Sequence, residues 1–170
     1  MTVHPDNINF LSNLGFRFTV RKLPNVNWFV QSAMIPGLTL PDAEHPTPFQ
    51  MTYRPGRTVE FDPLTISFKV DEDLNTFIEL TNWMRGIGFP ESYQEYESNV
   101  NTGLQDAVFS DATLMILNSN MNPSHEINFI DVFPINLSAL EFNSTSGDVE
   151  YVTVQASFRY LRYEIRKIAR

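Results

Sequence analysis

The sequence predicts a mainly β protein with one helix, that is, an α+β fold. Several segments alternate apolar with polar residues, as strands buried on one face do, and one segment has apolar residues at helical spacing. The length of 170 residues suggests a single domain over residues 1–170. Fourteen Phe, six Tyr and two Trp supply enough large side chains for a sizeable core.

The first strand is expected at residues 16–20. Phe16, Phe18 and Val20 alternate there with polar residues, which predicts a strand with one buried face. Residues 27–35 are expected to pair with it as a hairpin, and Pro24 begins a short turn over residues 24–26.

Residues 36–62 are expected to form an extended arm or edge hairpin. Six of the eleven prolines fall between Pro36 and Pro63, and proline cannot donate a hydrogen bond to a sheet. Residues 54–57, Arg-Pro-Gly-Arg, have the composition of a turn within this arm. A long arm in a small domain usually has a function, so Arg54 and Arg57 are candidate contacts with another subunit.

Residues 64–70 show the clearest strand pattern, and a helix follows them. Asp71 begins an acidic triplet that suits a helix N-terminus, both as a cap and as negative charge. Glycines at 86 and 88 end the helical pattern, which makes the helix about fourteen residues long. Trp83 is expected to be buried where this helix meets the sheet. The apolar side is expected to consist of Leu74, Phe77, Ile78, Thr81, Met84 and Ile87.

The remainder of the chain predicts more strands separated by polar connections. Residues 93–105 are expected to be a loop, and strands are expected at 112–118, 126–132, 135–142 and 152–160. The alternation slips at Tyr160, which predicts a bulge or bend at 160–161. Residues 161–170 are expected to be a basic C-terminal tail.

Charge is distributed unevenly. Between Glu60 and Glu150 there are sixteen acidic residues and two basic ones. This acidic body argues against sequence-specific binding to nucleic acid. Either the charges solvate separate faces, or an acidic surface of one copy meets the basic end of another. The second interpretation makes the basic residues of the tail candidate inter-subunit contacts: Arg162, Arg166, Lys167 and Arg170.

No catalytic, metal or cofactor site is expected. The chain has no cysteine, and its three histidines lie far apart at 4, 45 and 125 without ligand spacing. Motifs for phosphate, dinucleotide or serine-nucleophile sites are absent. Residues 1–10 do not have the pattern of a secretory signal, and the longest apolar run, 114–117, falls far short of the roughly 18 residues that span a bilayer. The sequence therefore predicts no membrane partner.

Small polar residues share one face of two predicted strands. They are either a solvated sheet face or the lining of a wide, wet lumen that forms when several copies join their sheets into one barrel. The residues of this candidate lumen face are Thr65, Ser67, Thr153, Gln155 and Ser157.

The order of these segments resembles the tail tube proteins of contractile-tailed bacteriophages. The matching features are an Ile-Pro-Gly junction at 35–37, the proline-rich arm, Arg-Thr-Val-Glu-Phe-Asp-Pro-Leu-Thr-Ile-Ser-Phe at 57–68, and a helix with Asn-Trp at 82–83. The later features are Val-Phe-Pro-Ile-Asn-Leu-Ser at 132–138, Leu-Glu-Phe-Asn-Ser at 140–144 and the long closing strand. The resemblance covers roughly residues 14–163.

This resemblance implies an antiparallel β-sandwich or half-barrel with an extended proline-rich arm. It further implies that six copies form a ring, that rings stack into a tube through which DNA passes non-specifically, and that the arm contacts the neighbouring ring. The partners would be tail sheath and baseplate proteins. The protein would belong to the virion and be assembled in the host cytoplasm. An acidic, small-polar lumen would repel phosphate and let DNA pass.

Two departures from the family keep an alternative open. The basic tail at 162–170 and the loop at 93–105 are longer than usual, which favours a specialised tube-like protein: a baseplate initiator or a tube-terminating adaptor. A free β-sandwich binding module, whose arm grips a ligand, is the alternative from another class. An enzyme ranks last because no nucleophile and base can be assembled from these residues.

Overall fold

The computed structural model describes residues 10, 11, 13, 15–88, 108–142 and 151–168. The predicted mainly β, antiparallel fold is confirmed, and the loop expected at 93–105 lies outside the described residues. The described elements are β1 (Phe16–Val20), α1 (Pro24–Phe29), β2 (Val30–Met34), β3 (Leu38–Thr39), β4 (Asp42–Pro46), β5 (Met51–Pro55), β6 (Glu60–Phe61), β7 (Leu64–Lys69), α2 (Asn75–Gly88), β8 (Ser110–Leu117), β9 (Pro123–Leu137), β10 (Thr153–Arg159) and β11 (Arg162–Lys167).

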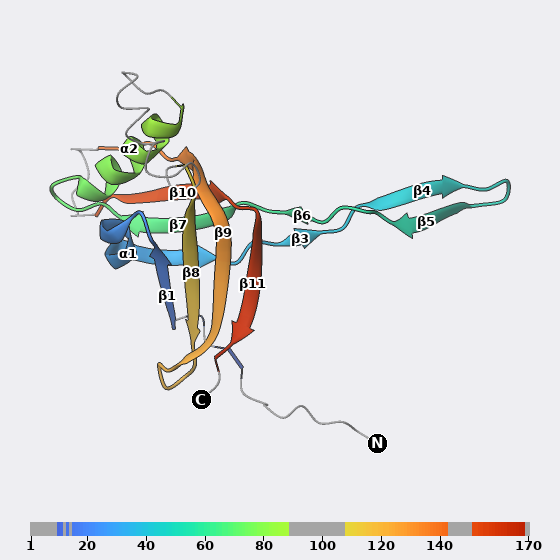
Figure 1. Cartoon of the computed structure of the whole chain (residues 1–170), viewed down its shortest axis with the longest axis horizontal. Coiled ribbons are helices and arrows are strands. Elements are labelled where there is room, and N and C mark those ends of the chain that lie inside the picture. Colours follow the sequence, from blue (N-terminus) through green and yellow to red (C-terminus); the bar gives the residue numbers. More distant parts are fainter. Residues whose placement is uncertain (1–9, 12, 14, 89–107, 143–150, 169–170) are drawn as a thin grey trace.

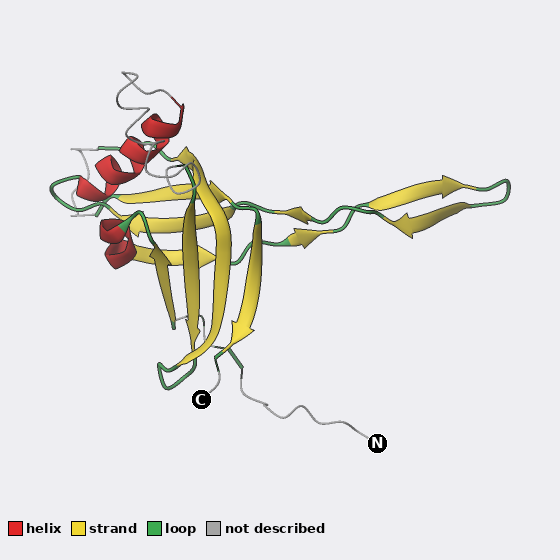
Figure 2. Ribbon diagram, viewed as in Figure 1, coloured by secondary structure: helices red, strands yellow, loops and turns green. Residues whose placement is uncertain are grey.

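Two antiparallel sheets share strand β9. The first part of β9 pairs with β8 and β11, and β8 pairs in turn with β1. The last part of β9 pairs with β10, which continues through β7 to β2. The strands of the second sheet run across those of the first, and the helices lie at one end of the body (Figure 1, Figure 2). The result is an open half-barrel rather than a closed one.

The hydrophobic core lies between the two sheets. Strands β1, β7, β8, β9 and β10 contribute alternate residues to it. Phe18 of β1, Phe68 of β7, Phe129 of β9 and Phe158 of β10 are therefore almost fully buried. These four phenyl rings come from both sheets, and their burial is the main force that holds the sheets together.

A bulge in β9 lets one strand serve both sheets. Asp131 has a φ of 56°, in the left-handed region, and the register between β8 and β9 shifts at this point. Ile127 and Phe129 point into the core before the bulge, and Val132 and Pro134 do so after it. The prediction of two strands at 126–132 and 135–142 was therefore wrong, because the inserted residue changes the phase of the alternation within one strand. Residues 138–142 follow that strand and are not part of it.

The predicted N-terminal hairpin was also wrong. Residues 24–29, expected as a turn and the start of a strand, form α1, and β2 pairs with β7 rather than with β1. The Asn27 side chain accepts from Val20 N–H at 2.7 Å and donates to the Val20 carbonyl at 3.0 Å. Glu79 of α2 accepts hydrogen bonds from the first backbone N–H groups of α1. These contacts with distant residues favour a helix over the local strand pattern.

Helix α2 has the predicted length, and its N-terminus is capped as predicted. Asp71 accepts hydrogen bonds from the backbone N–H of Thr76 at 2.8 Å and of Asn75 at 3.1 Å. The inner face differs from the prediction, since Thr76 and Leu80 are fully buried while Leu74 and Ile78 are exposed. Gly86 lies within the helix rather than at its end.

Trp83 lies at the junction of α2 and the sheets, as expected, but it is half-buried rather than buried. Its ring centroid lies 6.2 Å from that of Phe158, and its indole N–H donates to the Val108 carbonyl at 3.2 Å. Lys22 places its ammonium 5.5 Å from the ring centroid.

Replacing Trp83 by alanine should lower the free energy of unfolding by roughly 3 kcal/mol, at the lower end of the range for buried aromatic residues because Trp83 is only half-buried. Trp28→Ala is a matched control: Trp28 is 88% exposed, so the change should stay within about 0.5 kcal/mol. Urea denaturation measures both. Equal midpoints for the two variants would contradict the packing role of Trp83.

The cap on α2 predicts a specific loss of stability in acid. The hydrogen bonds from Thr76 lower the pKa of Asp71 from 3.8 to about 2. A lowered folded-state pKa adds stability above the unfolded pKa, and this stability is lost as pH falls from about 4 to about 2. The difference in urea midpoint between the wild type and Asp71→Asn should therefore shrink over that range, whereas Asp73→Asn serves as the control. If the difference in urea midpoint between the wild type and Asp71→Asn stays constant with pH, the charge of Asp71 does not stabilise the helix cap.

Candidate functional site: assembly surfaces

The five predicted lumen-face residues lie together on the outer face of the second sheet. Thr65 of β7 lies opposite Ser157 of β10, and Ser67 lies opposite Gln155. Thr153 continues the same row one pair further along. The intervening residues of both strands point into the core. Strand alternation thus separates a hydroxyl and amide face from the hydrophobic core, as the sequence predicted.

This polar face is not acidic. The charged residues at the outward positions of β7 and β10 are Lys69, opposite Thr153, and Arg159 at the other end of β10. Outward positions of β2 add Ser32 and Met34. We expected an acidic lining, but the outward positions of β7, β10 and β2 carry no acidic residue.

The arm is a long hairpin that projects away from the body (Figure 1). Strands β3 and β6 pair at its base, and β4 pairs with β5 farther out. Its turn is at residues 47–50, not at the predicted 54–57. Arg54 belongs to β5, and Arg57 follows that strand. Gly56 N–H donates to the Pro41 carbonyl at 2.7 Å, and a Cβ at this position would overlap that oxygen. The sequence suggested that Gly56 is a turn residue. The structure shows instead that a glycine is needed there because the two sides of the arm approach each other closely.

The base of the arm is fastened to the body. Tyr160 donates its hydroxyl to the Asp62 carbonyl at 2.8 Å, and Arg159 donates to the Phe61 carbonyl at 3.2 Å. The Phe61 ring packs edge-on against Tyr160 and Tyr163, each at 5.8 Å between centroids. Burial raises the pKa of Tyr160 to about 12, so the phenol stays protonated and remains a donor. This cluster sets the direction in which the arm leaves the body.

Residues 162–167, expected as a free tail, form strand β11 and pair with β9. Glu164 lies between two of the candidate contact residues, at 3.5 Å from Arg162 and 2.7 Å from Arg166. The hydrogen bond from Arg166 lowers the pKa of the Glu164 carboxyl. Both arginines therefore already have a partner in their own chain, although their side chains are 59% and 67% exposed. Lys167 lies opposite His125 in the register, and Arg170 is outside the described residues.

Three strands of the two body sheets have an unpaired side. In the described part of these sheets, β1, β2 and β11 each pair with one neighbour only. Open edges carry unsatisfied backbone donors and acceptors and are natural places for strands of another copy to pair.

Among the described residues, no group of His, Asp and Glu side chains is arranged to hold a metal ion. In the same part of the chain, no helix combines the length and the apolar character needed to cross a membrane.

A sequence profile of the phage tail tube protein family matches residues 4–166. The chain belongs to the phage tail tube protein family. This confirms the resemblance that the segment order suggested, and it identifies the chain as a phage tail component.

One relative of this tail tube family member is the tail tube terminator protein of Enterobacteria phage T4. The two are 33% identical over 141 residues, which cover 81% of this chain and 76% of the T4 protein. Solved structures with the same fold include the tube-terminating cap of the anti-feeding prophage, with a TM-score of 0.66, 17% identity and coverage of 99% and 100% of the two chains. Another is the sheath/tube terminator of an extracellular contractile injection system, with a TM-score of 0.60, 16% identity and coverage of 98% and 99%.

Sequence reasoning missed two features of the assembly surfaces of this tail tube family member. The arm tip was misplaced, although prolines at 46 and 48 on either side of Thr47 are a turn signal. The fastening of the arm by Tyr160 was also missed. No local signal identifies it, because the residues it joins, Asp62 and Tyr160, are 98 positions apart.

Removal of β11 should destabilise the folded chain itself. Truncation after Leu161 exposes one side of β9 and the rings of Phe61 and Phe129 that pack against Tyr163, so the loss should exceed the roughly 0.2–1 kcal/mol of an exposed ion pair. The matched control combines Arg162→Gln with Arg166→Gln and keeps the strand. It should lower the free energy of unfolding by no more than the contribution of the exposed ion pairs. Thermal or urea unfolding compares them. An unchanged midpoint in the truncated chain would restore the interpretation of this segment as a free tail.

Proposed function

We propose that this protein is a tail tube terminator: a ring that binds the end of the tail tube and stops its growth. The observation that carries the proposal is the 33% identity to the T4 tail tube terminator over 81% of this chain. The fold of the anti-feeding prophage tube-terminating cap, which spans 99% of this chain, adds support. Our first expectation was that the protein is the repeated subunit of the tube. We now favour the alternative function, that of a tube-terminating protein.

The described surfaces fit a ring of copies, for which we infer six. The open edges of β1, β2 and β11 give each copy places where a neighbour's strand can pair, which would remove unsatisfied backbone groups. The anchored arm gives each copy a second, projecting contact. In such a ring the face of Thr65, Ser67, Thr153, Gln155 and Ser157 would line the channel.

A lining of hydroxyls and one amide suits non-specific passage of DNA. These groups form weak, exchangeable hydrogen bonds, whereas rows of cations would hold phosphate strongly. Lys69 and Arg159 lie at the two ends of the rows rather than within them. The function is mechanical, without a catalytic step, and the partners are the tube's last ring and the tail sheath. Assembly would take place in the host cytoplasm before the tail joins the virion.

Negative-stain microscopy of the full-length protein tests this proposal, alone and with preformed tubes of the repeated tube subunit from the same phage. The protein alone should form single rings, and added to tubes it should bind one end and stop further elongation. Long tubes formed by this protein alone would identify it as the repeated subunit. Compact monomers that do not bind tube ends would identify a free binding module.

A further inference from the structure

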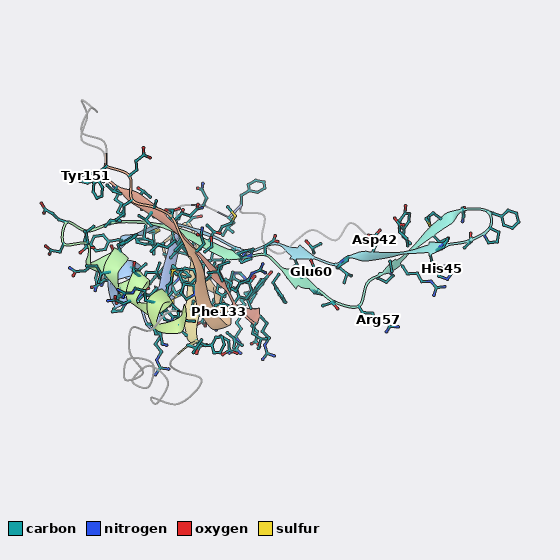
Figure 3. The ribbon with its side chains drawn as sticks, turned by 90° about the horizontal axis from the view of Figure 1, so that it is seen from above. Asp42, His45, Arg57, Glu60, Phe133 and Tyr151 are labelled. Atoms are coloured by element: carbon teal, nitrogen blue, oxygen red, sulfur yellow. The ribbon has the colours of Figure 1, made fainter. Side chains whose placement is uncertain are left out.

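Strand β11 forms an open edge of the first sheet. It pairs with β9 on one side, and within the described part of the chain no strand pairs with its other side. The outer arm does not cover this edge, because it carries Asp42 and His45 away from the body (Figure 1, Figure 3). An edge of this kind is a template for strands of other copies, and proteins protect it where such pairing would be harmful.

The register shows which backbone groups of β11 face the open side. The Ile168 N–H donates to the Ser124 carbonyl of β9 at 3.0 Å, and the bonds between antiparallel strands recur at every second residue. The even-numbered residues of β11 therefore bond to β9. The odd-numbered ones, Tyr163, Ile165 and Lys167, direct their N–H and C=O groups to the open side, where an added strand would bond to them.

The side chains of these odd-numbered residues lie on the core side of the sheet. Tyr163 is opposite Phe129 and Ile165 is opposite Ile127, and both partners in β9 are fully buried. Ile165 is nevertheless 58% exposed, because β11 is the last strand of the sheet. An exposed apolar side chain next to free backbone donors and acceptors favours the addition of another strand.

Lys167 places a charge at the end of this row. It lies opposite His125 on the core side of the sheet and is exposed. Arg162 and Arg166 are paired with Glu164, whereas the Lys167 ammonium forms no salt bridge or hydrogen bond within the described part of the chain. A strand added here would remove water from that ammonium group. Burying a charge without a partner costs more free energy than covering one isoleucine side chain gains.

The other two open edges carry no such charge. The core-side residues of β1 are Phe16, Phe18 and Val20, and β2, with the sequence Val-Gln-Ser-Ala-Met, is uncharged on both faces. Of these three edge strands, β11 alone has a charge on its core side. Inward-pointing charges at sheet edges and charged residues that flank apolar strand positions both oppose strand pairing between molecules.

We propose that Lys167 keeps β11 unpaired and so restricts strand pairing between copies to the other edges. This inference rests on the proposed ring, in which each copy joins two neighbours. A third edge that accepted strands would let one ring attach to another, so that assembly would not stop at a closed ring. Lys167 thus acts against contact between copies, which is the opposite of the inter-subunit contact predicted from the sequence.

Hydrogen exchange of the full-length wild type tests the proposal at β11 itself. Mass spectrometry of peptides that cover β11 compares the assembled protein with protein diluted until it dissociates. The amides of Tyr163, Ile165 and Lys167 should exchange equally fast in both states, because no strand covers them. Strand β2 is the internal reference, since pairing at that edge should slow its exchange in the assembly. Slower exchange of β11 in the assembled protein would overturn the proposal.

The substitution Lys167→Val removes the charge and leaves a β-branched side chain in the core-side row. In sedimentation velocity at equal concentration, this variant should form assemblies of at least about twice the wild-type mass, because its edge is no longer protected. Lys167→Glu keeps a charge at this position and should retain the wild-type size.

Arg166→Val is the matched control for the loss of a positive charge. It changes the same strand but its outer face, so Lys167 still protects the edge and the assembly should keep the wild-type size. Equal growth of Arg166→Val and Lys167→Val would contradict the proposal, as would the absence of growth in Lys167→Val. Urea unfolding accompanies these measurements. If Lys167→Val grows only with a lowered urea midpoint, the growth comes from unfolded chains and the proposal fails.

The outcomes separate this inference from the function on which it rests. If the wild type forms rings that bind tube ends and Lys167→Val forms the same rings, the role of Lys167 is wrong and the terminator proposal stands. If the wild type remains monomeric and does not bind tube ends, the terminator proposal fails. Growth of Lys167→Val beyond the wild-type size would then still support the protective role of Lys167.

Discussion

The change of phase within β9 is the constraint on which the fold depends. A strand buried on one face can serve two crossing sheets only if its inward residues stay inward on both sides of the crossing. The extra residue at Asp131 achieves this, because it turns Val132 and Pro134 into the core after Ile127 and Phe129. Without that insertion, the part of β9 that pairs with β10 would present its polar side to Phe158 and Phe68. The crossing of the two sheets at β9 depends on this bulge, together with a second register shift where β9 pairs with β10.

A second constraint links the body to the arm. The chain turns at Tyr160, between β10 and β11, and the phenol at this turn holds the Asp62 carbonyl where the arm rejoins the body. The surrounding rings of Phe61, Phe129 and Tyr163 bury that bond and strengthen it. The same turn therefore ends the polar face, begins β11 and directs the arm. Coupling these three features in one cluster keeps the polar face, β11 and the arm in a constant relative orientation.

Electrostatics has a more local role than the charge pattern of the sequence suggested. Arg162 and Arg166 are paired with Glu164 of their own strand, and Arg159 holds the arm base. Charge pairs that are already satisfied within the chain gain little from a further partner in water.

The sequence by itself determined the strands at 16–20, 64–69 and 153–159, the polar face, the capped helix and the proline-rich arm. These features depend on alternation, helical spacing or backbone chemistry within a few residues. Only the tertiary structure decided that residues 24–29 form a helix, that 123–137 form one strand, that 162–167 form another, and that the arm turns at Thr47. The first three depend on a partner far away in sequence: Glu79 for α1, two sheets for β9, and β9 for β11. The arm tip depends on how β4 and β5 pair. Local periodicity shows which side of a strand is apolar, but the choice of partner depends on contacts that form only when the whole chain packs.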